Sequence, residues 1–485
     1  MTTLCILLAA MRDAARATLP DVATQIHALY LTNQLMTGLD RLKVLPTQAD
    51  REAFFEVIES PRSSNTSPIT AAYSYFVGLL RGGAGTQPAP DLPRLQRILL
   101  DKLNLVSIKL APADNAYRIF ESLNAKGMRL TQSDLLRNYF FMRLPPASHD
   151  ELYSNVWSPM QERVDRTGER KNFESYIRDA LVKDGDFTRN DEVYQSWKTK
   201  LDKISDGEIA GTMEELAAYS HYYARFIDPD REESTEVAIR LRRLNRWGGT
   251  TIYPFLLNLY GDVDAGRIDA SGLAEILTMI ESYLVRRLFA NVAPNALNRI
   301  FIRLYRQIPD DGSMVDATRT ALSAPGLRWP GDIEFEDSIL TYRLYLDSRP
   351  DQRKLILERI EDDFDEKERM DFGPLEIEHI MPQTLTTEWR DLLGASAEDK
   401  HRRLLHTLGN LTLTGHNPEL SNHPFQRKQD LYLKSKLAMN REVAEAPSWG
   451  ESEVLARGRR LAQRAIRLWP GPIRTPEAAD DGVTR

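Results

Sequence analysis

The fold is decided by two stretches near the C-terminal end, LEIEHIMPQTL at residues 375–385 and HTLGNLTLTGHNPELSNHPFQRKQDLYLKS at residues 406–435. The first predicts a short strand that ends at Glu378 and His379. In the second, Leu408–Thr414 predicts another strand, and a helix follows from about Glu419. The predicted order is strand, strand, helix, with an acid–histidine pair on the first strand and asparagines in the later elements.

Hydrolysis of a phosphodiester explains these residue types. A neutral imidazole near pH 7 can take a proton from water, and this is the role expected of His379. An ion such as Mg²⁺ prefers hard oxygen ligands, which the Glu378 carboxylate and the Asn417 amide supply. Asn410 is expected to orient His379 through a hydrogen bond. The pattern predicts a ββα-metal nuclease domain with one divalent ion, Mg²⁺ or alternatively Mn²⁺.

Histidines gather in this part of the chain, since five of the eight lie between His379 and His423. His416 and His423 are rival metal ligands, and imidazole ligands would suit Mn²⁺, Ni²⁺ or Zn²⁺. His401 and His406 are expected to be surface or packing residues.

The same end of the chain is basic although the whole protein has a net charge of −7. Residues 401–470 hold 12 Lys and Arg against 6 Asp and Glu. Such a local surface is compatible with a nucleic-acid site. The residues expected to contact DNA phosphates are Arg427, Lys428 and Lys434. Arginines of the last helix either form a solvated face or contact DNA: Arg457, Arg459, Arg460, Arg464 and Arg467.

The C-terminal stretch resembles the HNH domain found at the C-terminus of GmrSD-type restriction proteins and of SspE-like phage-defence proteins. The matching features are EHIMPQ, Trp389, LGNLTLT, Asn417, SNHPF, Lys428, YLKS at 432–435 and a final helix between Trp449 and Pro470. The resemblance implies an HNH-family endonuclease, a phosphodiester hydrolase that acts on DNA in bacterial defence against foreign DNA.

The first part of the chain resembles the ParB/Srx-like N-terminal domain of the same proteins. IFESLNAKGMRLTQSDLLRN at 119–138 is similar to late landmarks of that domain. In the helical region that follows, ESYLVRRLF and NALNRIF at 281–301 are similar to the same proteins. The family's earlier DGQQR-type motif, associated with nucleotide binding and hydrolysis, is absent from this sequence. We therefore expect a chain that is N-terminally incomplete relative to its family, and the absent motif argues against nucleotide regulation.

Within residues 119–138, three residues have two interpretations. Asn124 and Gly127 fit the end of a helix, where glycine readily takes a left-handed conformation. Asp134 follows Thr131 in a capping-box-like pattern that opens the next helix. The alternative is that Asn124, Gly127 and Asp134 belong to a nucleotide-binding motif.

The expected fold class is mainly α with a C-terminal α+β domain of the ββα-metal, HNH type. Residues 1–150 are assigned to the C-terminal portion of the ParB/Srx-like domain, 151–345 to a helical region, 346–472 to the nuclease domain and 473–485 to a flexible tail. Residues 105–110 are a short strand candidate. The apolar start, MTTLCILLAAMRDAARA, predicts a buried amphipathic helix and not a secretory signal.

The sequence contains one cysteine, which excludes a disulfide framework and a cysteine-based zinc site. It contains no run of eighteen apolar residues that would span a membrane. These features favour a cytoplasmic protein.

Three functions follow in order of preference. The first is a metal-dependent DNA endonuclease or nickase of a restriction system, acting on foreign DNA that includes modified DNA, as a homo-oligomer or with companion defence proteins. The second is a catalytically silent regulatory protein that senses DNA or a nucleotide, which the absent motif favours and the intact His379 disfavours. The third is a nuclease directed at RNA.

Overall fold

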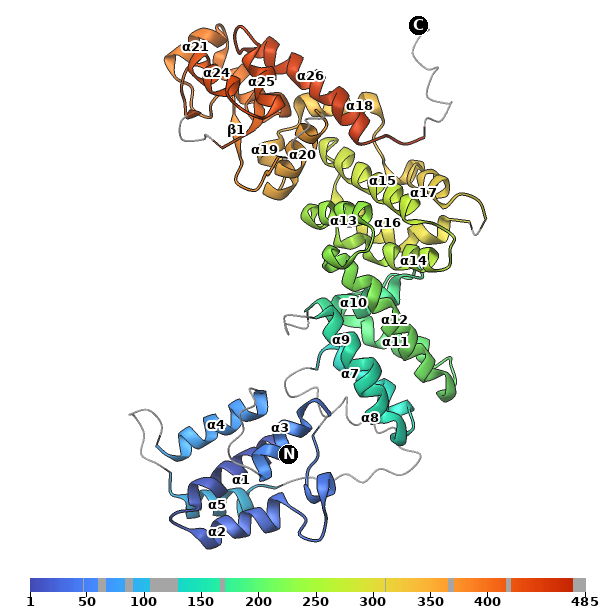
Figure 1. The fold of residues 1–485 in the computed structure, drawn as a ribbon, viewed down its shortest axis with the longest axis vertical. Coiled ribbons are helices and arrows are strands. Elements are labelled where there is room, and N and C mark those ends of the chain that lie inside the picture. The colour runs from blue at the N-terminus through green and yellow to red at the C-terminus, as the bar shows by residue number, and fades with distance from the viewer. Residues whose placement is uncertain are drawn as a thin grey trace. The chain divides into compact units, whose positions relative to one another are not determined.

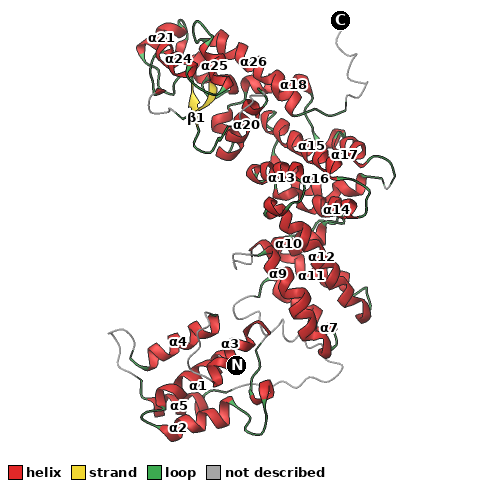
Figure 2. Ribbon diagram, in the orientation of Figure 1, coloured by secondary structure: helices red, strands yellow, loops and turns green. Residues whose placement is uncertain are grey.

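The computed structural model describes residues 1–46, 48–59, 67–82, 90–104, 130–165, 171–309, 311–364, 370–415 and 420–473. These residues form two compact units. The first unit comprises Met1–Arg129 and Ala147–Tyr153, and the second comprises Leu130–Pro146 and Ser154–Arg485. The described part of the chain is mainly helical (Figure 1) with one small two-stranded sheet in the second unit (Figure 2).

The first unit contains short α-helices with intervening turns of π- and 3-10 helix. Its elements are α1 (Thr2–Ala15), α2 (Pro20–Gln25), η1 (Ile26–Leu31), η2 (Gly38–Arg41), η3 (Gln48–Asp50), α3 (Arg51–Glu59), α4 (Pro68–Leu80), α5 (Leu92–Arg97), η5 (Ile98–Lys102) and α8 (His149–Leu152).

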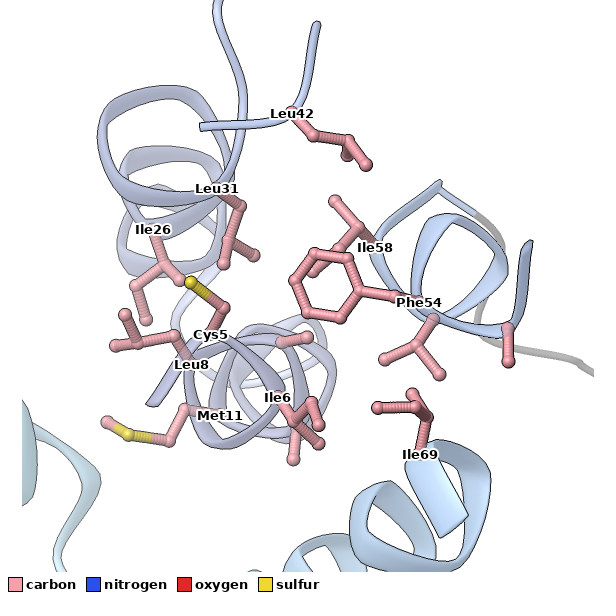
Figure 3. Close-up of a cluster of buried hydrophobic side chains, with 14 of the residues drawn as sticks. Cys5, Ile6, Leu8, Met11, Ile26, Leu31, Leu42, Phe54, Ile58 and Ile69 are labelled. Atoms are coloured by element: carbon pink, nitrogen blue, oxygen red, sulfur yellow. The ribbon is translucent and has the colours of Figure 1, made fainter. Parts of the chain in front are cut away.

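The core of the first unit forms around α1, as the apolar start of the sequence predicts. Cys5, Ile6 and Met11 of this helix are buried against side chains of η1, α3 and α4 (Figure 3). Arg12 is also buried, and its guanidinium donates to the carbonyl groups of α3. The prediction of a buried amphipathic helix is confirmed.

The second unit begins with a series of helices. These are α7 (Gln132–Arg143), α9 (Ser158–Val164), α10 (Lys171–Val182), α11 (Val193–Leu201), α12 (Ile209–Ile227), α13 (Thr235–Trp247), α14 (Tyr253–Asp264), α15 (Ala270–Phe289), α16 (Leu297–Leu304), α17 (Met314–Leu322), α18 (Asp332–Thr341), α19 (Leu344–Asp347) and α20 (Pro350–Asp362).

The remaining elements hold the residues of the expected nuclease site. They are β1 (Glu376–His379), α21 (Thr387–Leu393), α22 (Ala397–Leu404), η15 (Leu408–Asn410), β2 (Leu411–Thr414), α24 (Phe425–Leu433), α25 (Ala438–Ala444) and α26 (Glu451–Leu468). None of the described helices is both long enough and apolar enough to cross a bilayer.

Polar contacts join the end of α26 to α15. The Trp469 indole donates to Glu281 at 2.9 Å, and the Ser282 hydroxyl donates to the Pro470 carbonyl at 2.6 Å. Arg286, which is fully buried, donates to the Trp469 carbonyl at 2.7 Å and to Asp332 at 2.8 Å. Arg286 therefore braces α15 against the start of α18 and the chain that follows α26.

Several local predictions can be compared with these elements. The helix predicted from Thr131 begins there, because the Thr131 hydroxyl accepts from the Asp134 amide. The strand predicted at 408–414 is shorter, since residues 408–410 form a 3-10 turn before β2. The strand candidate at 105–110 lies outside the described residues, and the assigned domain boundaries stay predictions.

Asp179 is a buried carboxyl group in the aromatic core between α10 and α12. It accepts from the Tyr223 hydroxyl at 3.1 Å and from Arg178 at 3.1 Å. Burial disfavours the charged form more strongly than these partners favour it, and this raises the pKa of Asp179 to about 7.

This pKa predicts a pH-dependent stability. The folded protein retains a proton on Asp179 that the unfolded chain, with a pKa of about 3.9, releases. The contribution of protonated Asp179 to the free energy of unfolding is therefore full below about pH 4 and is lost as the pH rises through about 7. In Asp179→Asn, stability relative to wild type should rise across this window by on the order of a few kcal/mol. Urea denaturation at several pH values measures the difference, and the exposed Asp191→Asn should show none.

Candidate active site

The site forms where β1 and β2 pair as antiparallel strands. Their register places Glu378 opposite Thr412 and His379 opposite Leu411. A two-stranded sheet is marginally stable by itself, so neighbouring helices have to hold it. One contact of this kind comes from α25, where Asn440 accepts from the Thr412 hydroxyl at 2.5 Å and donates to the Leu413 carbonyl at 2.9 Å.

His379 lies at the end of β1 with only 4% of its surface exposed. Its Nε2 atom is 3.1 Å from Nδ1 of His406, and its ring meets the Tyr345 ring edge-on with centroids 4.5 Å apart. Burial, and then the charges of His406 and Lys428, lower the pKa of His379 to about 3. The imidazole is therefore neutral at pH 7, with a lone pair on one ring nitrogen.

His406 is part of this site, although the sequence suggested only a surface or packing role. It is half-buried, and its ring stacks on Tyr345 with centroids 5.7 Å apart. The backbone amide of Tyr345, in α19, donates to the His406 carbonyl at 3.2 Å. Only the clustering of histidines in the sequence pointed to a role for His406 in the site. No spacing rule connects residues 345, 379 and 406, so sequence patterns did not predict their contact.

Glu378 forms a buried ion pair with Lys428 of α24. Lys428 Nζ is 2.6 Å from Glu378 Oε1 and donates to the His379 carbonyl at 3.0 Å. Burial raises the pKa of Glu378 and lowers that of Lys428, while each charge opposes the shift of the other. The prediction that Lys428 contacts DNA phosphates needs correction, because its side chain has no exposed surface and is bound to β1.

The other two cations predicted to contact DNA are exposed. Arg427 lies on α24 and Lys434 is its C-cap, and neither forms an ion pair with a described residue. They are seven residues apart, which is close to two helical turns, so they lie on the same face. This face is open to a phosphate backbone, whereas Lys428 points into the domain.

Asn410 is fully buried and fixes the backbone that follows β1. Its Oδ1 accepts from the Met381 amide at 2.8 Å and from the Trp449 indole at 3.1 Å. Its Nδ2 donates to the carbonyl groups of Met381 at 3.0 Å and Leu405 at 2.9 Å. These four bonds use the capacity of the amide. The predicted hydrogen bond from Asn410 to the His379 ring is therefore wrong. Asn410 instead binds the backbone of Met381, two residues after His379.

The turn that carries Asn410 is held closely against α26. A Cβ atom at Gly409 would lie 2.3 Å from the Val454 carbonyl oxygen, so a larger residue does not fit without backbone movement. Arg457 is fully buried and donates to the carbonyl groups of Gly409 at 2.9 Å and Leu411 at 2.8 Å.

Three other arginines of α26 form ion pairs with acids, whereas Arg459 is exposed and has no ion pair with a described residue. Arg460 pairs with Glu442, and Arg464 and Arg467 pair with Asp363 at 2.9 and 3.3 Å. Together with the buried Arg457, they favour a structural interpretation of this helix.

Several predicted site residues lie outside the described residues, namely Asn124, Gly127, His416 and Asn417. Asp134 is described and forms an ion pair with Arg137 at 3.2 Å, in addition to its part in the helix cap. The structure thus gives Asp134 a structural role.

The fit to a divalent ion rests on one described ligand. Glu378 has its Oε1 on Lys428, which leaves Oε2 for a cation that keeps most of its waters, as Mg²⁺ commonly does. Among the described residues, no three His, Cys, Asp or Glu side chains gather to hold a metal. The second expected ligand, Asn417, lies in the part that is not described.

Two family models match the chain. The C-terminal domain of GmrSD restriction endonucleases matches residues 329–464, which include β1, β2, α24 and most of α26. The N-terminal domain of GmrSD restriction endonucleases matches residues 1–141. The chain belongs to the GmrSD-type restriction endonucleases. A search of curated proteins finds no match.

The family assignment makes this chain a nuclease of a restriction system, and such an enzyme acts on DNA. The C-terminal match includes each described residue of the site: Tyr345, Glu378, His379, His406, Asn410 and Lys428. The site therefore lies within the conserved domain of a GmrSD-type protein and not in the region between the two matches.

The ion pair provides a stability test in this GmrSD-type chain. Lys428→Met keeps much of the side-chain volume but leaves the Glu378 carboxylate buried without its partner, at a cost of about 3–5 kcal/mol. Arg427→Met, at the exposed neighbouring position, should change stability by less than about 0.5 kcal/mol. Denaturation by urea, followed by circular dichroism, compares the two. Equal effects of the two substitutions would contradict the buried pair.

Proposed function

We propose that the C-terminal domain is a metal-dependent HNH endonuclease or nickase that cuts foreign DNA, including modified DNA. The observation that carries the proposal is the position of His379. It ends the first of two paired strands, beside Glu378, and the following helix α24 contacts both residues through Lys428. This strand, strand, helix order with a neutral histidine suits hydrolysis of a phosphodiester.

In the proposed reaction, His379 takes a proton from the attacking water. One of the two facing nitrogens, His379 Nε2 or His406 Nδ1, must carry the proton that joins the rings. When Nε2 of His379 donates to His406, Nδ1 of His379 holds the lone pair that accepts the water proton. His406 then selects the tautomer and orientation of the base, and Tyr345 restricts both rings.

A basic group with a pKa near 3 is a weak proton acceptor. Binding of DNA would raise this pKa. A negative phosphodiester close to His379 favours the protonated imidazole and raises its pKa. Burial therefore keeps the imidazole neutral at pH 7, and the phosphate charge of bound DNA would make it a stronger proton acceptor.

The divalent ion is the second component of the proposal. Glu378, through Oε2, and Asn417 would hold it, and such an ion supplies charge neutralisation at the scissile phosphate. Mg²⁺ fits these oxygen ligands best, and Mn²⁺ is the alternative. Lys428 holds the Glu378 carboxylate in place through Oε1.

The test of the base compares plasmid nicking by wild type and His379→Ala in the presence of Mg²⁺ or Mn²⁺. We expect the variant to lose on the order of 10²–10⁴-fold in rate, the usual contribution of a general base. The control is His221→Ala, since His221 is exposed on α12 in the helical region. A purified wild type that nicks no faster than His379→Ala would refute the proposal.

The exposed face of α24 gives a separate test of DNA contact. Arg427→Ala and Lys434→Ala should each weaken DNA binding with little dependence on sequence. Each should also reduce the slope of log K against log salt by about one. Fluorescence anisotropy over a series of salt concentrations, without divalent ion, measures this. Arg460→Ala, whose side chain already pairs with Glu442, is the control and should leave the slope unchanged.

The burial of the site favours a second candidate function, a DNA-binding protein that does not cut. His379 is 4% exposed and Glu378 is already paired with Lys428. A calorimetric titration with Mn²⁺ separates the two functions. Binding that Glu378→Gln weakens supports the nuclease, and the absence of metal binding supports the silent protein.

A further inference from the structure

A polar cavity of about 850 Å³ lies in the helical region of the second unit. Residues of α10, α12, α14 and α16 line it, together with the turn before α14. Most of these residues belong to the segment between the two family matches, so the nuclease assignment gives the cavity no role. Its size is within the range of sites that bind small molecules.

Five side-chain amides are part of the lining of this cavity. The side-chain amides of Asn172, Asn190 and Asn298 make no hydrogen bond to another described residue. Gln132 and Asn245 are fixed more firmly: Gln132 accepts from the Tyr194 amide at 2.8 Å, and Asn245 donates to the Phe226 carbonyl at 2.6 Å. The cavity therefore offers both free and pre-oriented amides, each with donors and acceptors side by side.

Aromatic rings form another part of the wall. Tyr223 and Tyr253 both line the cavity, and their rings meet edge-on with centroids 5.3 Å apart. Their hydroxyl groups are held by Asp179 at 3.1 Å and by Asn245 at 2.9 Å. The rings are thus fixed in orientation and almost fully buried, so they form a rigid wall of the cavity.

The charged residues of the lining are two cations and two acids, and one of the acids, Asp179, retains a proton below about pH 7. Arg178 donates to Asp179 at 3.1 Å, and Glu174 accepts from the backbone amide of Ser133 at 3.2 Å. Of the cations, Lys171 is exposed at the start of α10. Such a lining does not suit a polyphosphate, which needs a surplus of cations or a run of backbone amides. One buried donor, Arg178 Nε, has no hydrogen-bond partner among the described residues.

We propose that this cavity binds a neutral nucleobase-type heterocycle. Asn and Gln amides form paired hydrogen bonds with the edges of bases. Aromatic side chains and amide groups together are what proteins use to read a base outside the duplex. The free side-chain amides and the absence of a surplus of cations in this lining match a neutral ligand of this class, whether it arrives as a free nucleoside or as a base turned out of DNA.

The binding test uses the full-length protein without divalent ion, so that no cleavage occurs. Isothermal titration with each of the four deoxynucleosides measures the free ligand, and inorganic phosphate is titrated alongside. A duplex with 2-aminopurine opposite a mismatch measures the extruded base, because fluorescence rises when this base leaves the stack. A response in either arm supports the proposal, and the arm that responds identifies the source of the ligand.

Two variants connect binding to the cavity. Asn172→Ala combined with Asn298→Ala removes two free amides, and Ser175→Trp places a large ring at an exposed lining position. Each should raise the Kd at least tenfold. Asn295→Ala is the matched control, since Asn295 is exposed just before α16 and outside the lining. Circular dichroism confirms that each variant is folded.

Three results would overturn the proposal. They are no response of folded wild type in either arm, binding of phosphate without any nucleoside, and binding that Ser175→Trp and the double variant leave unchanged. None of them affects the nuclease assignment, because plasmid nicking depends on His379 and is measured separately with a divalent ion.

Discussion

The buried pair between Glu378 and Lys428 is the interaction on which the rest of the site depends. It connects the first strand to the helix that follows the second strand, across fifty residues of sequence. The ammonium group also donates to the His379 carbonyl, so the backbone at this residue is fixed from the helix side. A buried pair of this kind is weak evidence for net stability, yet it permits few alternative arrangements of its two elements.

Two other buried side chains fix the backbone near His379. Asn410 uses its amide to fix the backbone at Met381, and Arg457 binds the carbonyl groups of the turn that carries Asn410. The Asn410 amide thus fixes the backbone after His379 and just before His406. Buried polar contacts of this kind tolerate substitution less readily than apolar packing does.

Sequence reasoning located the two strands, the acid–histidine pair and the cap at Thr131 because periodicity and local residue preferences determine them. It misassigned Lys428, since a lysine next to an exposed arginine on a basic helix gives no sign that its own position faces inward. It also misassigned Asn410, whose partners at 381, 405 and 449 are distant in sequence. His406 was missed for the same reason. Each error concerns a long-range polar contact, which a local pattern does not contain.

The close approach of Gly409 to α26 has a consequence for the order of synthesis. The turn that positions the backbone after His379 needs Trp449 and Arg457, which leave the ribosome more than sixty residues after the histidine. An unfinished chain therefore lacks the contacts that hold the backbone after His379. The backbone around residues 379–381 therefore reaches its final arrangement only after the last helix has been synthesised.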